Sequence, residues 1–151
     1  AREQRFDGRQ LADKIGEHRT MERLLRQIMV RNPSYHHAYN ALGYSLADRN
    51  TRLTEARALI GKALELAPQD PYIMDSLGWL EFRSGNLQEA LRILNDAYKA
   101  RPDAEIAAHL GEVLWAAGQK DQASAVWKEG ATLSPQNETL RETMRRLGGA
   151  P

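Results

Sequence analysis

The stretch MDSLGWLEFRSGNLQEAL, residues 74–91, decides the fold of this chain. Its pattern predicts a helix, a turn around Gly85 and a second helix. Gly78 lies in the middle of the first helix, where a glycine costs roughly 1 kcal/mol relative to alanine. We therefore expect that another helix packs closely against Gly78, next to Trp79.

The same pattern returns along the chain with a period of about 34 residues. The pair Leu-Gly occurs at residues 42–43, 77–78 and 110–111, in steps of 35 and 33. An alanine, a small residue and a proline keep the same register. The residues of this signature are Leu42, Gly43, Ala56, Ala63 and Pro68, then Leu77, Gly78, Ala90, Ala97 and Pro102, then Leu110, Gly111, Ala123, Gly130 and Pro135. Four residue classes in one register indicate a repeated structural unit.

This signature resembles the tetratricopeptide repeat, a helix–turn–helix unit. The resemblance implies an all-α fold, a tetratricopeptide-repeat α-solenoid of stacked antiparallel helix pairs that ends in a capping helix. The predicted units are a partial upstream repeat at 1–33 (a helix pair, with a break at Gly8 or Gly16), repeats at 34–69, 70–103 and 104–136, and a capping helix with its tail at 137–151.

The predicted helix ends carry matching signals. Gly85 and Gly118 follow first helices, where a left-handed cap needs no Cβ. Asp70 and Asp103 precede first helices as N-caps. Asn86 begins an Asn-x-x-Glu start of the next helix.

Two further positions bear on the packing. Asn137 is the expected N-cap of the capping helix, whose apolar residues recur at helical spacing. Glu81 departs from the signature, which has an apolar residue there, so we expect Leu80 or Phe82 to fill that space. Trp127, at a signature position, is expected in the core.

Composition excludes several classes of function. The 151 residues include no cysteine, which rules out disulfides, thiol catalysis and zinc–thiolate sites. A net charge of +1 is not the basic footprint of a nucleic-acid-binding protein. No apolar run is long enough to span a membrane. His36 and His37 are consecutive and do not share a helix face, so we expect no metal site. The chain is predicted to be no enzyme and to need no cofactor.

The resemblance implies that the first helix of each pair lines a concave surface that binds a protein or peptide. Carried onto this chain, the predicted partner contacts are Asn40, Tyr44, Tyr72, Asp75, Trp79, Phe82, Arg83, Glu105, Glu112 and Trp115. Trp79 is expected to face this groove as a free aromatic ring. Residues 70–112 hold eight acidic and four basic residues, which favours a partner with basic and apolar side chains. Glu105 would repel a peptide carboxylate, so a chaperone-tail binder is not expected.

The segments ALGYSLADRN, DSLGWLEFRSG and PDAEIAAHLGEVLWAAGQKDQASAVWKEG give a closer resemblance. They are similar to the C-terminal repeats of proteobacterial tetratricopeptide lipoproteins, including a pseudomonad lipoprotein that is an adaptor for a carboxyl-terminal processing protease. This resemblance implies a periplasmic adaptor that is held to the outer membrane by a lipid anchor outside this sequence, with the protease as a partner. The alternative is a self-association module, in which the partial upstream repeat pairs with a second copy to give a homo-oligomer.

Overall fold

A computed structural model describes the backbone of residues 8–148 and the side chains of residues 14–148. The elements in chain order are α1 (Gly8–Arg31), α2 (His36–Asp48), α3 (Leu53–Leu66), α4 (Pro71–Arg83), α5 (Leu87–Ala100), α6 (Ala104–Ala116), α7 (Lys120–Leu133), α8 (Glu138–Thr143) and the π-helical turn η2 (Met144–Gly148). Every element in this described part of the chain is helical, so the predicted all-α fold is confirmed.

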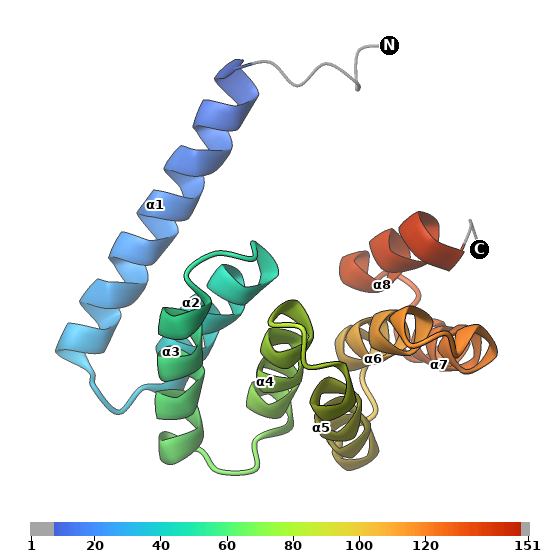
Figure 1. Ribbon diagram of the computed structural model, residues 1–151. Helices are drawn as coiled ribbons and strands as arrows, with labels where there is room; N and C mark the ends of the chain where they lie inside the picture. Colours follow the sequence, from blue (N-terminus) through green and yellow to red (C-terminus); the bar gives the residue numbers. More distant parts are fainter. Residues whose placement is uncertain (1–7, 149–151) are drawn as a thin grey trace.

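The helices form three antiparallel hairpins, α2–α3, α4–α5 and α6–α7, which stack side by side as in a solenoid (Figure 1). The apolar core runs between them in two clusters. One joins α2, α3 and one face of α4, and the other joins α4 to α8 around Trp127, which is buried as predicted. A single hairpin cannot bury its apolar face alone, so stacking supplies the missing contacts.

Glycines at the helix crossings explain the Leu-Gly pairs. A Cβ atom on Gly78 would lie 2.6 Å from Leu94 Cγ, and one on Gly43 would lie 2.7 Å from Ile60 Cγ1. Real Cβ atoms do not come this close to other heavy atoms. The first and second helices of each hairpin therefore touch where the signature places a glycine, as expected from the sequence.

Most of the predicted caps are present. Asp70 Oδ1 accepts hydrogen bonds from the backbone amides of Tyr72 and Ile73, and Asp103 caps α6 in the same way. Gly85 and Gly118 have φ angles of +90° and +84°, the left-handed region that favours glycine. Asn86 is at the N-cap position of α5, as predicted, but its side chain makes no cap hydrogen bond: its amide donates to Glu81 Oε1 at 2.7 Å.

Glu81 itself is 8% exposed and also accepts hydrogen bonds from Arg57. The expectation that an apolar neighbour fills its place is wrong, because the charged side chain stays in the interface and is paired there. Leu80 is buried in its own right and Phe82 packs against Trp79.

The first helix differs from its prediction. Residues 8–31 form one continuous helix, so Gly16 does not break it and no helix pair forms within this range. One exposed glycine costs roughly 1 kcal/mol, which is too little to interrupt a long helix. Leu25 and Met29 of α1 pack against the core of the first hairpin. Residues 1–7 lie outside the described residues.

The predicted capping helix is present as α8, which continues into η2. We call α8 and η2 the C-terminal lid. Asn137 Oδ1 accepts a hydrogen bond from the amide of Leu140 at 2.9 Å, and Leu140 is buried against α6 and α7. Figure 1 shows α8 lying over α6 at the end of the array. None of the helices within residues 8–148 has the length and apolar character that crossing a membrane requires.

Candidate partner-binding groove

A cavity of about 580 Å³ opens on the concave side of the array. Residues from the first helices of all three hairpins meet there, together with the C-terminal lid and one residue of α1. The lining residues are Lys14, Tyr44, Asp48, Trp79, His109, Glu112, Glu138, Thr139, Glu142, Thr143 and Arg146. We call this cavity the groove.

A second cavity of about 200 Å³ adjoins the groove through Tyr44. Among the residues that line it are four of the predicted partner contacts, Asn40, Tyr72, Asp75 and Glu105. Tyr44, Trp79 and Glu112 line the groove itself. These seven predicted residues are thus brought together on the concave face, while Phe82, Arg83 and Trp115 lie elsewhere. Whether any of them contacts a partner stays a prediction.

Trp79 is enclosed, and the expectation of a free ring is wrong. The side chain is 5% exposed, its ring stacks on His109 with centroids 4.5 Å apart, and its Nε1 donates to Asp48 Oδ1 at 3.1 Å. Asp48 of α2 and His109 of α6 contact the ring from the two neighbouring hairpins. Trp79 therefore contributes an edge to the groove and most of its area to the core.

Of the three remaining predicted residues, Phe82 packs against Trp79 of its own helix, and Trp115 and Arg83 support packing between helices. Trp115 stacks on Trp127 with centroids 5.6 Å apart and lies under Lys120. Arg83 donates to the backbone oxygens of Ala47 and Asp48, which end α2. Arginine can satisfy carbonyl groups at a helix C-terminus in this way, so Arg83 links the first and second hairpins.

A buried polar cluster around His109 forms part of the wall of the groove. His109 on α6 is 2% exposed, and its Nδ1 donates to Asp75 on α4, with both carboxylate oxygens within 3.0 Å. Its Nε2 is 3.1 Å from the hydroxyl of Tyr44 on α2. The sequence placed Asp75 and Tyr44 on the concave side but did not single out His109. The one available signal is the spacing of 34 residues between Asp75 and His109, close to one repeat.

Burial and charge shift the pKa values of this cluster. Burial raises the pKa of the Asp75 carboxyl and raises that of Tyr44 strongly. Burial favours the neutral ring of His109, but the charge and hydrogen bond of Asp75, with Glu105 and Asp48 nearby, leave the pKa of His109 raised. The pair therefore retains a proton more tightly than either group does in water.

The groove carries a surplus of negative charge. Among the described residues that line it, the carboxylates are Asp48, Glu112, Glu138 and Glu142, and the cations are Lys14 and Arg146. Arg146 is paired with Glu112 at 2.6 Å. Within residues 14–148, no group of three or more acidic, histidine or cysteine side chains is arranged to hold a metal ion.

Comparison with known families identifies the array. The sequence profile described as "Tetratricopeptide repeat" matches residues 13–71 and 76–138. This chain belongs to the tetratricopeptide repeat (TPR) family. TPR proteins are protein-interaction scaffolds and are typically not enzymes.

One curated relative is similar over nearly the whole chain. The TPR repeat-containing protein PA4667 of Pseudomonas aeruginosa is 50% identical over 140 residues, which cover 93% of this chain and 24% of that protein. The chain therefore spans about a quarter of the length of this relative.

Solved structures share the TPR fold at low sequence identity. TTC0263, a thermophilic TPR protein of Thermus thermophilus, has a TM-score of 0.74 and 20% identity, covering 89% of this chain and 74% of its own. MamA has a TM-score of 0.61 and 17% identity, covering 96% and 87%. At these identities the likeness concerns the fold alone.

On the prediction that α1 is the second helix of an upstream repeat, its residues can be aligned with those of α3. Pro33 follows it as Pro68 follows α3, which aligns Ile28 with Ala63. Ala63 is fully buried, whereas Ile28 is 38% exposed and Leu24 beside it is 49% exposed. The apolar face of α1 around Leu24 and Ile28 is therefore only partly covered.

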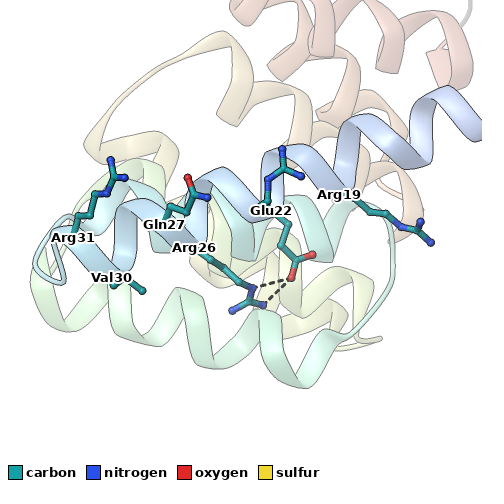
Figure 2. Close-up of a pocket in the computed structure, with 7 residues that line it drawn as sticks. Arg19, Glu22, Arg26, Gln27, Val30 and Arg31 are labelled. Carbon is teal, nitrogen blue, oxygen red and sulfur yellow. Dashed lines mark hydrogen bonds and ion pairs between the residues drawn. The ribbon is translucent and has the colours of Figure 1, made fainter.

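Another face of α1 is rich in arginine. A cavity of about 580 Å³ lies along this helix. Figure 2 shows residues that line it, with Arg26 hydrogen-bonded to Glu22. The lining residues are Arg19, Glu22, Arg23, Arg26, Gln27, Val30 and Arg31. All of them come from α1, so this cavity is a shallow surface between long side chains, on a different face from Leu24 and Ile28.

Proposed function

We propose that the groove binds a segment of a partner protein that carries lysine or arginine next to apolar residues. TPR arrays use their concave surface for binding. The single observation that supports a basic partner is the charge of the groove. Four carboxylates line it with two cations; Glu112 and Glu142 are paired with Arg146 and Arg145, and Asp48 and Glu138 remain opposite Lys14.

The groove also offers the shape that a peptide or helix needs. It extends across the first helices of three hairpins and ends at the C-terminal lid, and the adjoining cavity continues it past Tyr44. Glu105 lines the adjoining cavity and accepts hydrogen bonds from Asn137 and Thr139. A carboxylate terminus placed there would meet a negative charge, so we propose an internal or basic segment as the occupant.

Two synthetic amphipathic peptides of equal length test this proposal, one with lysine and leucine and the other with glutamate and leucine. Fluorescence anisotropy should detect binding of the lysine peptide, weakening with salt. A Glu138→Gln/Glu142→Gln variant should bind it about tenfold more weakly. Both residues are exposed, so the fold should tolerate the change.

The matched control removes two exposed acids that do not line the groove, Glu65 on α3 and Asp96 on α5, as Glu65→Gln/Asp96→Asn. This variant should bind like the parent. Equal weakening in both variants would show a general charge effect, and equal binding of the two peptides would refute the assignment of a basic partner.

For the natural partner, we propose a carboxyl-terminal processing protease of the periplasm. Support comes from the resemblance of three segments to protease-adaptor lipoproteins and from the 50% identity to a Pseudomonas relative. In this proposal the whole protein is anchored to the outer membrane by lipid and brings the protease to its substrates.

Two measurements test the adaptor proposal. Purified protease should bind the chain in solution and should cleave its protein substrates faster when the whole adaptor is present. Lipid labelling and membrane fractionation of cells should place the whole protein in the outer membrane. The proposal would be refuted if the protease did not bind the chain and cleaved its substrates at the same rate with and without the whole adaptor.

A second candidate function is self-association through α1. The observation that favours it is the partly exposed apolar face at Leu24 and Ile28, which in the TPR register would pack against another helix. Sedimentation velocity should then show a concentration-dependent dimer that Leu24→Glu/Ile28→Glu abolishes. Val30 is 81% exposed on the arginine-rich face, so Val30→Glu is the control that should leave a dimer intact. A monomer at all concentrations would exclude this function.

A further inference from the structure

His109, in the wall of the groove, connects three successive hairpins. Its ring contacts Asp75 of the second hairpin, Tyr44 of the first and the stacked ring of Trp79, while Trp79 in turn donates to Asp48 of the first hairpin. Movement of α6 away from α2 and α4 would break the three contacts that His109 makes with Asp75, Tyr44 and Trp79. The cluster therefore fixes the curvature of the concave face.

The cluster encloses a charge that depends on one proton. Asp75 and His109 are both buried, and a protonated ring gives the carboxylate a cation at 2.9 Å. Loss of the proton leaves a buried carboxylate beside neutral groups, an arrangement that is strongly destabilising in proteins. Exposure to water would relieve this cost.

The surroundings of the ring are mainly acidic. The ionisable groups that face it from the packed elements are Tyr44 and Asp48 on α2, Asp75 on α4, and Glu105 and Glu112 on α6. The groove in front of the ring adds Glu138 and Glu142 of the lid and the cations Lys14 and Arg146. Toward α5 and α7, α6 contributes apolar residues such as Leu110 and Leu114. The net negative field favours the protonated ring.

We propose that the His109–Asp75 pair is a proton-dependent clamp: the protonated ring holds α6 against α2 and α4, and release of its proton to solvent loosens this junction and widens the groove. The clamp acts on the arrangement of the three hairpins relative to one another. An effect on partner binding rests in addition on the proposed function of the groove.

The direction of the pH effect follows from the raised pKa of His109 in the folded chain. A group whose folded-state pKa lies above its unfolded value stabilises the fold below the unfolded value, which is about 6.5 for histidine. That contribution is lost as the pH rises through the folded-state pKa. The clamp is therefore closed in mildly acidic solution and loosens on the alkaline side.

The test measures the distance between α3 and α7 by double electron–electron resonance. The chain has no cysteine, so labels placed by Ala58→Cys/Ala125→Cys, both at exposed alanines, are the only ones. The distance distribution should be narrow at about pH 6 and broader or longer at about pH 9. An identical distribution at both pH values would overturn the proposal.

Two further variants in the labelled background isolate the cause. His109→Gln retains an amide that can donate to Asp75 but does not titrate, so its distribution should not change with pH. His37→Gln removes an exposed histidine of α2 and should respond like the parent. A pH response that persists in His109→Gln would overturn the proposal.

If His109→Gln fails to fold, as judged by circular dichroism, NMR of the His109 ring in the parent chain replaces the measurement on this variant. Its NMR resonances should titrate over the same pH range as the distance change, and a mismatch would overturn the clamp. No partner is present in these experiments, so their result is independent of whether the lysine peptide binds. If both proposals hold, peptide affinity should vary with pH in the parent and not in His109→Gln.

Discussion

Arg57 on α3 forms two hydrogen bonds, of 2.8 and 2.9 Å, with the buried carboxylate of Glu81 on α4. The pair crosses from the first hairpin to the second at the position where the repeat signature has an apolar residue. The pKa of Glu81 is lowered, chiefly by the Arg57 hydrogen bonds. An ion pair has therefore replaced an apolar contact in the stacking of two repeats.

Removing Arg57 should cost more than replacing its buried partner Glu81 by an apolar residue. Arg57→Ala leaves the Glu81 carboxylate buried without its cation, so urea unfolding should show a loss of about 1–2 kcal/mol in unfolding free energy. Glu81→Leu restores the apolar residue of the signature and should lie closer to the parent. Lys62→Ala, at an exposed lysine of the same helix, is the control and should change little. A larger loss in Glu81→Leu than in Arg57→Ala would contradict this account.

Acid should weaken the attachment of α1. Glu22 on α1 lies 2.6 Å from Arg52 and 2.8 Å from Arg26, and the Arg52 hydrogen bonds in particular lower the pKa of Glu22 from 4.5 to about 2. A lowered folded-state pKa stabilises the fold above the unfolded value, and this contribution is lost as the pH falls from 4.5 toward 2. Thermal unfolding should show the parent more stable than Glu22→Gln at neutral pH.

The difference between parent and Glu22→Gln should shrink through that pH interval and vanish near its lower end. Glu17→Gln, at an exposed glutamate nearer the start of α1, serves as the control and should follow the parent. A difference between parent and Glu22→Gln that stays constant down to pH 2 would argue against the ion-pair explanation.

Glycines in the helices should separate into two classes. A Cβ on Gly111 would lie 2.0 Å from Trp127 Nε1, so Gly111→Ala should overpack the third hairpin and cost about 1–3 kcal/mol. A Cβ on Gly61 of α3 would have open space around it among the described residues. Gly61→Ala should therefore stabilise the chain by up to about 1 kcal/mol. Chemical denaturation measures both, and equal effects would remove the packing explanation of the Leu-Gly pairs.

The sequence predicted the hairpins well because the repeat is a local pattern. Gly78, Gly85 and Asp70 each report on contacts or caps within one hairpin, where spacing along a helix determines which side chains meet. The length of α1 was not predicted, since a single exposed glycine carries too little energy to end a helix.

The groove was predicted less well because it depends on curvature. Helical position indicates that Trp79 points to the concave side, but its burial depends on His109, which lies 30 residues further along the chain, and on the distance between α2 and α6. Glu81 was missed for a related reason. Its partner Arg57 belongs to the neighbouring hairpin, and no pattern within one repeat signals it.

The bond between Tyr44 and His109 also bears on how the array unfolds. In a stacked array whose units touch only their immediate neighbours, the ends can fray one unit at a time. Here a side chain of the first hairpin is hydrogen-bonded to a side chain of the third hairpin, which is not its immediate neighbour. Unfolding of either outer hairpin therefore removes a contact from the other. The three hairpins should lose structure together, as one cooperative block.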